Sequence, residues 1–160
     1  MLNITIACVG RLKESYWREA CGEYGKRLGG FCRLTIAEVE EERLPDNPSA
    51  AQIEACLRAE GRRLLAKVPP GAALWALCIE GKTISSPELA RRLEELAVGG
   101  TSHVALAVGG SWGLSPQVKE AARLRLSMSP MTFPHQLARV MLLEQIYRAM
   151  QISGGGKYHK

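Results

Sequence analysis

The sequence predicts an α/β domain built on a mainly parallel β-sheet with flanking helices. Short apolar, β-branched runs alternate with stretches of helical periodicity along the whole chain. The turns between them carry glycine, proline or serine where strands end and helices begin. A composition of 46% hydrophobic and 23% charged residues is typical of a globular chain and excludes a disordered one. We expect one domain over residues 1–160, with a C-terminal tail at about 153–160.

Four elements are expected in the first half of the chain. A strand, a helix, a strand and a helix follow one another over residues 3–9, 13–28, 33–39 and 49–67. The strands are short apolar runs with β-branched residues. The first helix ends at Gly29-Gly30, and the second begins at Ser49, which has capping-box spacing to Gln52. A polar loop over 40–48 separates the second strand from the second helix.

The second half repeats this order. Strands are expected over 72–79, 103–108 and 124–128, and helices over 86–98, 115–123 and 134–152. Ser86 is the predicted N-cap of the first of these helices, with Pro87 in its first turn. The last helix begins at Pro134 and is apolar over more than one face, which one sheet does not cover. A second copy of the chain is the simplest cover, so we expect a homodimer.

Composition also limits the location and the cofactors. No apolar run approaches the ~20 residues of a membrane span, and the N-terminus lacks the basic segment of a signal peptide. We therefore expect a soluble, cytoplasmic protein without a membrane partner. The five cysteines show neither disulfide nor metal-ligand spacing, so no metal is expected. Cys8 and Cys78 lie in apolar runs and are expected in the core.

The net charge of +5 is concentrated at one end of the chain. Residues 119–160 hold seven Lys/Arg and two Asp/Glu, which accounts for all of the excess. Two interpretations fit this charge: a solvated basic face, or a surface for a polyanion such as RNA.

Three expected strand ends are rich in glycine or serine, namely residues 79–82, 109–113 and 127–133. Ligands of open α/β sheets bind at the carboxyl ends of strands, and glycine lets them approach the backbone closely. Gly81-Lys82-Thr83 is not a P-loop, because position 76 is alanine where that motif needs glycine. Residues 109–113 do not have the dinucleotide-binding spacing either.

The start of the last helix carries two further candidates. Pro134 fixes the helix start, which places His135 and Arg139 one turn apart on one face at the ligand end of the sheet. Residue type alone leaves two interpretations, a pair of solvated polar side chains or part of an active site.

Several long motifs resemble one known family. They are Thr132-Phe133-Pro134-His135-Gln136-Leu137-Ala138-Arg139, Leu142-Leu143-Glu144-Gln145-Ile146-Tyr147-Arg148-Ala149, Tyr158-His159-Lys160, Gly109-Gly110-Ser111-x-Gly113-Leu114-Ser115 and the strand ending in Val9-Gly10. Together they resemble the RlmH family, the 23S rRNA (pseudouridine-1915 N3)-methyltransferases, which are minimal members of the SPOUT class. The resemblance covers the whole chain and is densest after residue 104.

The resemblance implies a SPOUT fold with a C-terminal trefoil knot, a rare exception to the rule that chains are unknotted. It implies that S-adenosyl-L-methionine, the methyl donor, binds in the knot. It also implies a homodimer acting on 23S rRNA within the assembled ribosome. The cofactor-binding residues implied by the motif match are Leu77, Gly109, Met128, Ser129, Pro130, Met131, Thr132 and Phe133.

The chemistry assigns roles to the remaining candidates. The N3 of pseudouridine is a weakly acidic imide, and His135 is a candidate base for its proton. Arg139 either stabilises charge on the neighbouring carbonyl oxygen or holds a phosphate. The resemblance implies that Tyr158 and His159 close over the partner's cofactor, which makes His159 a rival base. Lys157 follows three glycines, at a position where relatives often carry proline. The tail is therefore expected to be more mobile than in those relatives.

Two other functions fit the same residues. One is a SPOUT RNA methyltransferase with another target, such as a ribose 2′-hydroxyl in tRNA. The other is a non-catalytic ribosome-binding module that uses the basic C-terminal quarter. Trp112, in the glycine-rich loop, either stacks on a base or packs on the knot.

Overall fold

The computed structural model describes residues 1–160 as five strands alternating with five helices. The strands are β1 (Leu2–Val9), β2 (Cys32–Val39), β3 (Ala73–Thr83), β4 (His103–Val108) and β5 (Leu124–Ser127). The helices are α1 (Ser15–Leu28), α2 (Ala50–Ala66), α3 (Ser86–Val98), α4 (Pro116–Ala121) and α5 (His135–Ser153). Every predicted element is present, most of them within two residues of the expected ends.

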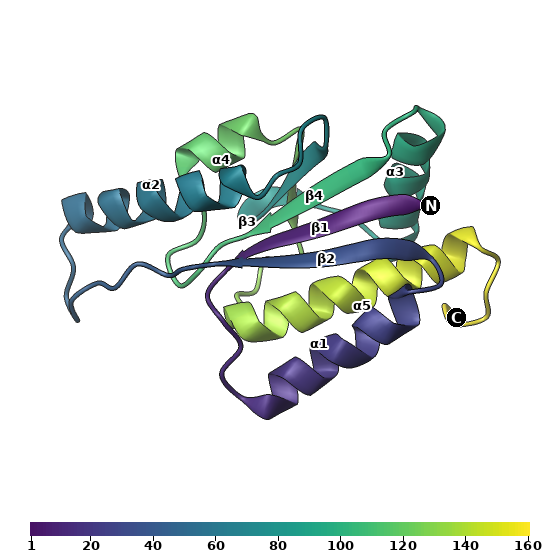
Figure 1. The fold of residues 1–160 in the computed structure, drawn as a ribbon, viewed down its shortest axis with the longest axis horizontal. Coiled ribbons are helices and arrows are strands. Elements are labelled where there is room, and N and C mark those ends of the chain that lie inside the picture. Colours follow the sequence, from purple (N-terminus) through teal and green to yellow (C-terminus); the bar gives the residue numbers. More distant parts are fainter.

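The five strands form one parallel sheet in the order β2-β1-β4-β3-β5 (Figure 1). In its register Ile4 of β1 lies between Leu34 of β2 and Val104 of β4. Because all strands run the same way, the carboxyl ends of β1, β4, β3 and β5 lie along one edge of the sheet. The predicted α/β fold is therefore confirmed.

Helices cover both faces of the sheet. Side chains alternate along β1, so that Ile4 and Ile6 belong to the core beneath α1, α3 and α5, while Ala7 and Val9 belong to the smaller core beneath α2 and α4. Both isoleucines are fully buried, and burying one such side chain stabilises the fold by about 1.5–3 kcal/mol.

The α5 helix is covered within its own chain more fully than its sequence suggests. It packs against α1 and α3 as well as the sheet, and Leu142, Leu143 and Ile146 are buried there. The α1 and α3 helices therefore cover apolar faces of α5 that the sheet alone leaves open, so these faces do not by themselves require a partner subunit. The homodimer itself stays a prediction.

Helix starts follow the capping residues, with one correction. The capping box of α2 forms as predicted between Ser49 and Gln52. The N-cap of α3 is Ser85 rather than Ser86, and its hydroxyl accepts a hydrogen bond from the Glu88 amide at 3.2 Å. The backbone of Ser85 is extended, as a cap requires, and Ser86 is already helical.

The β3 strand continues four residues beyond its predicted end, to Thr83. The register of its pairing with β5 shifts between Leu77 and Lys82, since both of these residues lie opposite Leu126. The residues between them bulge out of the ladder and bend the strand. A Cβ atom at Gly81 would lie 2.6–2.8 Å from backbone atoms of Arg125 and Leu126, so the bend needs glycine at this position.

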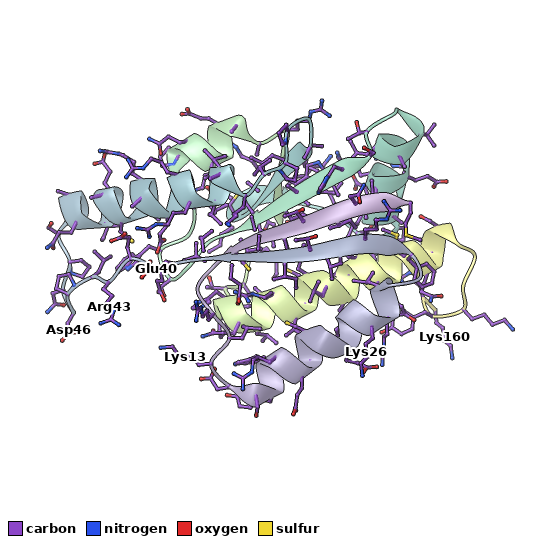
Figure 2. All side chains as sticks on the ribbon, viewed as in Figure 1. Lys13, Lys26, Glu40, Arg43, Asp46 and Lys160 are labelled. Atoms are coloured by element: carbon purple, nitrogen blue, oxygen red, sulfur yellow. The ribbon has the colours of Figure 1, made fainter.

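The polar segment between β2 and α2 runs along the outside of the molecule. Figure 2 shows Glu40, Arg43 and Asp46 along it, away from the sheet. No helix of the structure is both long enough and apolar enough to span a bilayer.

Candidate active site

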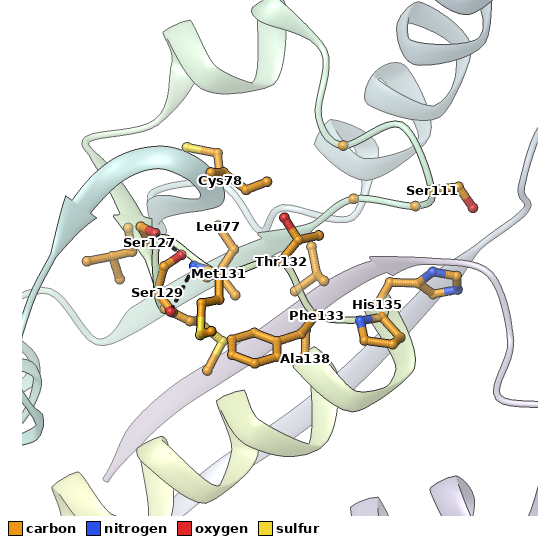
Figure 3. A pocket seen from close by; sticks show the side chains of 18 residues that line it. Leu77, Cys78, Ser111, Ser127, Ser129, Met131, Thr132, Phe133, His135 and Ala138 are labelled. Carbon is orange, nitrogen blue, oxygen red and sulfur yellow. Dashed lines mark hydrogen bonds between the residues drawn. The ribbon is translucent and has the colours of Figure 1, made fainter.

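The three strand-end segments singled out in the sequence meet in one cavity of about 550 Å³ (Figure 3). The cavity lies at the carboxyl edge of β3, β4 and β5, and the first turn of α5 closes one side. It is lined by Leu77, Cys78, Ile79, Val108, Gly109, Gly110, Ser111, Gly113, Leu126, Ser127, Met128, Ser129, Met131, Thr132, Phe133, Pro134, His135 and Ala138. A volume of this size is typical of sites for small molecules and cofactors.

Seven of the eight residues expected to bind the cofactor line this cavity; they are Leu77, Gly109, Met128, Ser129, Met131, Thr132 and Phe133. The eighth, Pro130, does not line it and is exposed on the outside of its loop. Cys78, Val108, Leu126 and Ala138 also line the cavity and were not among the residues predicted for the site. Cys78 was expected in the core but is half-buried in the wall, because the β3 bulge turns this part of the strand toward the cavity.

Two hydrogen bonds hold the loop after β5 in shape. The Ser127 hydroxyl donates to the Ser129 carbonyl at 3.0 Å, and the Met131 amide donates to the Ser129 hydroxyl at 3.0 Å. Figure 3 shows both bonds as dashed lines at one side of the cavity. The loop is therefore ordered before any ligand binds, which lowers the entropic cost of binding.

The loop after β4 is tightly folded on itself. A Cβ atom at Gly109 would overlap the backbone of Gly113, so this position accepts only glycine without a shift of the loop. Gly110 and Gly113 form an isolated bridge, and the Gly113 amide donates to the Gly110 carbonyl at 3.1 Å. Backbone rather than side chains therefore forms this wall of the cavity.

The lining of the cavity carries no Asp, Glu, Lys or Arg side chain. Half of its 18 residues are hydrophobic, and its polar side chains are serine, threonine and histidine. Such walls suit an aromatic ring flanked by a few hydrogen-bonding groups. Burial raises the pKa of the Cys78 thiol, with a further contribution from the charge of Glu80. The thiol thus adds no negative charge at neutral pH.

His135 and Arg139 are placed differently, although they lie one turn apart on α5. His135 lines the cavity and is half-buried. Arg139 is 2% exposed, and its guanidinium donates to Glu38 Oε2 at 2.6 Å and to the Gly10 carbonyl at 3.1 Å. Arg139 therefore ties the first turns of α5 to the ends of β1 and β2 and does not line the cavity.

The C-terminal tail lies at the other end of α5. The Tyr158 hydroxyl donates to Glu144 Oε1 at 2.9 Å, and its ring packs edge-on against Tyr147. The bond to Glu144 and burial raise the pKa of Tyr158. The His159 Nδ1 atom accepts from Arg148 at 3.2 Å. Arg148 is 13 residues along α5 from His135, or about 20 Å, so the tail does not reach the cavity of its own chain.

A second cavity of about 370 Å³ adjoins the first and shares Leu77, Leu126, Ser127 and Met128 with it. Glu144 and Gln145 of α5 line its far side. Glu144 is the residue that holds both Tyr158 and Arg148, so this cavity extends from the main site toward the docked tail. No group of three or more His, Cys, Asp or Glu side chains is arranged to hold a metal ion.

Glu60 of α2 is a buried carboxylate beneath the loop after β4. It is 3% exposed and accepts a hydrogen bond from the Glu42 amide at 3.0 Å. Burial raises the pKa of Glu60, and the nearby charge of Glu41 adds to this. A raised pKa in the folded state means that stability is lost as the pH rises through that pKa.

Glu60→Gln is therefore expected to stabilise the protein at pH 8 by up to about 1 kcal/mol, because the amide keeps an acceptor for Glu42 without a buried charge. The gain should shrink toward pH 4, where the wild-type carboxyl is itself neutral. Urea unfolding at both pH values measures this difference. Glu54→Gln, which alters an exposed ion pair with Arg58, is the control. A variant less stable than the wild type at pH 8 would contradict the expectation.

Comparison with known proteins assigns this fold and site to a class. Residues 2–159 match the model of a family described as "Predicted SPOUT methyltransferase". The chain belongs to the SPOUT methyltransferase family, whose methyl donor is S-adenosyl-L-methionine. It is therefore a methyltransferase, and the resemblance found in the motifs is confirmed.

Its relatives within this class share one name. A protein of Pelotomaculum thermopropionicum named "Ribosomal RNA large subunit methyltransferase H" is 49% identical over 159 residues, which is 99% of each chain. A protein of Clostridium novyi with the same name is also 49% identical over 159 residues, covering 99% of this chain and 100% of that one. The similarity thus extends over the full length of these relatives.

Two solved structures have a similar fold at low sequence identity. A probable methylase family protein from Haemophilus influenzae has a TM-score of 0.57 and 13% identity, covering 99% of this chain and 71% of that one. A putative methyltransferase from Legionella pneumophila, in complex with the bound cofactor SAM, has a TM-score of 0.50 and 14% identity. That match covers 95% of this chain and 66% of the other.

Proposed function

We propose that this protein methylates N3 of pseudouridine 1915 in 23S rRNA, and that it acts on assembled ribosomes in the cytoplasm. The observation that carries the proposal is the cavity of about 550 Å³ at which three strand-end loops meet. It occurs in a chain 49% identical to proteins named as large-subunit rRNA methyltransferases. We treat residues 1–160 as one domain whose tail is about 153–160.

The cavity fits the expected methyl donor. Its apolar walls and backbone-lined loop suit an adenine ring. Because no Lys or Arg lines the cavity, no positive charge of the lining repels a sulfonium cation. When bound, S-adenosyl-L-methionine supplies an activated methyl group on that sulfonium. The proposed cofactor-binding residues are Leu77, Gly109, Met128, Ser129, Met131, Thr132 and Phe133. Pro130 contributes by shaping the loop.

The chain's own residues then have to remove one proton and hold the target base. His135 lines the cavity and is the proposed base for the imide proton at N3. Arg139 is proposed as a positioning residue, because its guanidinium joins Glu38 and the Gly10 carbonyl one turn below His135. It thereby holds the start of α5 against the sheet.

We place Tyr158 and His159 at the cavity of the partner in a homodimer. In their own chain these residues dock against Glu144 and Arg148, which lie about 14 and about 20 Å along α5 from His135. The three glycines before Lys157 provide the hinge that such a movement needs. Several apolar residues of α5, among them Val140 and Met141, stay half-buried and are available for the dimer contact.

The trefoil knot is part of the same proposal. The segment after β5 enters the space between the bent β3 strand and α5, where Met128 lines both cavities. Gly81 packs directly on the β5 backbone at Arg125 and Leu126. This close packing supports a threaded chain.

The deciding experiment is methyl transfer from radiolabelled S-adenosyl-L-methionine to 70S ribosomes, separated subunits and naked rRNA, followed by mass spectrometry of the 23S rRNA. We expect label on assembled ribosomes, at N3 of one pseudouridine. Cofactor binding without transfer to any of these substrates would refute the rRNA target and favour tRNA. A protein that binds ribosomes but no cofactor would be a binding module.

Gly109→Ala is expected to weaken S-adenosyl-L-methionine binding by about tenfold, because the added methyl group overlaps Gly113 and shifts the wall by up to about 1 Å. Isothermal titration calorimetry measures the change. Gly22→Ala is the matched control, since a Cβ at this position on α1 meets nothing within 4 Å. Unchanged affinity in Gly109→Ala would place the cofactor elsewhere.

A further inference from the structure

One end of the cavity mouth carries side chains for which the proposed chemistry has no use. Ser111 and His135 lie at this end in Figure 3. Trp112 sits between Ser111 and Gly113, which both line the cavity, but does not line it itself and is 50% exposed. An indole with half of its surface in water has a ring face available to a ligand. The exposed half of the indole is therefore free to contact a ligand.

The loop that carries Trp112 is held rigidly. Gly110 and Gly113 bridge across it, and Gly113 has a φ of 84°, a conformation that glycine adopts without strain. Ser111 and Trp112 therefore form the tip of a closed turn. A rigid aromatic side chain loses little entropy when it stacks on a ligand.

Two exposed cations lie on the neighbouring loop. Cys8 of β1 pairs with Val108 of β4, and a Cβ atom at Gly110 would lie 3.1 Å from Val9, so the loops that follow these two strands leave the sheet as neighbours. Arg11 and Lys13 on this loop are exposed and form no ion pair. Arg18 fixes the loop by donating to the carbonyls of Leu12 and Lys13, at 2.9 and 2.5 Å.

At the opposite end of the cavity two lysines are held in ion pairs. Lys82, near the β3 bend, pairs with Glu88 at 3.7 Å, and Lys119 pairs with Glu80. On the β2 side, the run Glu40–Glu42 bounds the basic loop with negative charge. Arg11 and Lys13, exposed and without an ion-pair partner, therefore lie toward the end of the mouth that also carries Trp112.

We propose that Trp112, Arg11 and Lys13 form a binding surface for single-stranded RNA, on which Trp112 stacks against an unpaired base next to the target base. This inference rests on the proposed RNA substrate and names the residues that hold it. Aromatic stacking is tolerant of base identity, and the two cations supply the phosphate contacts that single strands need. Stacking requires a base that is not already paired, which an rRNA loop provides.

The test is binding of the full chain to 70S ribosomes at several salt concentrations, with S-adenosyl-L-methionine present. Trp112→Ala should weaken binding about tenfold, and Trp112→Phe should retain most of it. Arg11→Ala and Lys13→Ala should each lower the slope of log affinity against log salt by about one. Lys26→Ala is the matched control: Figure 2 shows Lys26 near the far end of α1 from Lys13, and it too is exposed without an ion pair.

The controls separate this inference from the proposed function. Cofactor affinity should be unchanged in all four variants of the surface, because none of these side chains lines the cavity. Equal ribosome binding by Trp112→Ala and wild type would overturn the inference, as would a tenfold loss of cofactor affinity in Trp112→Ala. If the wild type binds 70S ribosomes without transferring methyl groups to them, the proposed function fails, and the ratio between variants still decides the role of Trp112.

Discussion

His135→Asn is expected to lower the rate of methyl transfer by about 10²–10⁴-fold while leaving cofactor affinity unchanged. This is the range associated with the loss of a positioned general base. His135 is the one histidine that lines the cavity, and the imide proton at N3 has to leave before or during methylation. Single-turnover transfer to ribosomes, together with titration of the cofactor, separates the chemical step from binding.

The other two histidines provide the comparison. His103 lies at the start of β4, bonded to Thr5 Oγ1 at 2.8 Å and at the opposite edge of the sheet from the cavity. His103→Asn should therefore keep full transfer activity. His159→Asn tests the rival base on the tail. A large loss in His159→Asn with near-normal transfer in His135→Asn would assign proton removal to the partner's tail.

Arg139→Ala is expected to lower the free energy of unfolding by about 2–4 kcal/mol. Removing one partner of a buried ion pair leaves the charge of the other without a counter-charge. Where both side chains are fully buried, such a change costs about 3–5 kcal/mol. The remaining Glu38 side chain is 36% exposed, so water relieves part of this cost. The Gly10 carbonyl also loses its donor. Urea unfolding of the wild type and the variant measures the difference.

A double-mutant cycle with Glu38→Gln isolates the pair itself. Arg58→Ala is the matched surface control, since its pair with Glu54 is exposed and should be worth no more than about 0.5 kcal/mol. A stable Arg139→Ala with greatly reduced transfer would contradict the positioning role and make Arg139 a catalytic residue.

Local patterns in the sequence were sufficient for the elements and the wall of the site. Alternation of β-branched runs with capped helices predicted all five strands, and β4 was predicted to the residue. Glycine and serine at the strand ends predicted which loops would meet, because the carboxyl ends of parallel strands share one edge. The motifs of the last third predicted the family.

Long-range packing decided the details that these patterns miss. The helical spacing of His135 and Arg139 placed both on one face, but the sheet supplies Glu38 and the Gly10 carbonyl only on the side of Arg139. Cys78 lies in a run of sequence as apolar as that around Cys8. The bulge opposite Leu126 nevertheless places Cys78 in the cavity wall. Glu38 is far from Arg139 in sequence, and Leu126 is far from Cys78, so no local sequence pattern predicts either contact.

The strands, the helices and the three loops of the site follow from local sequence, because propensity, capping and the periodicity of apolar residues act over a few residues. Which of the candidate residues face the cavity depends on how the elements pack. A side chain's direction is set by the elements packed against it, as Glu38 on β2 sets that of Arg139 and Glu144 on α5 sets that of Tyr158. These contacts span up to 101 residues of chain, a range at which the fold alone brings groups together.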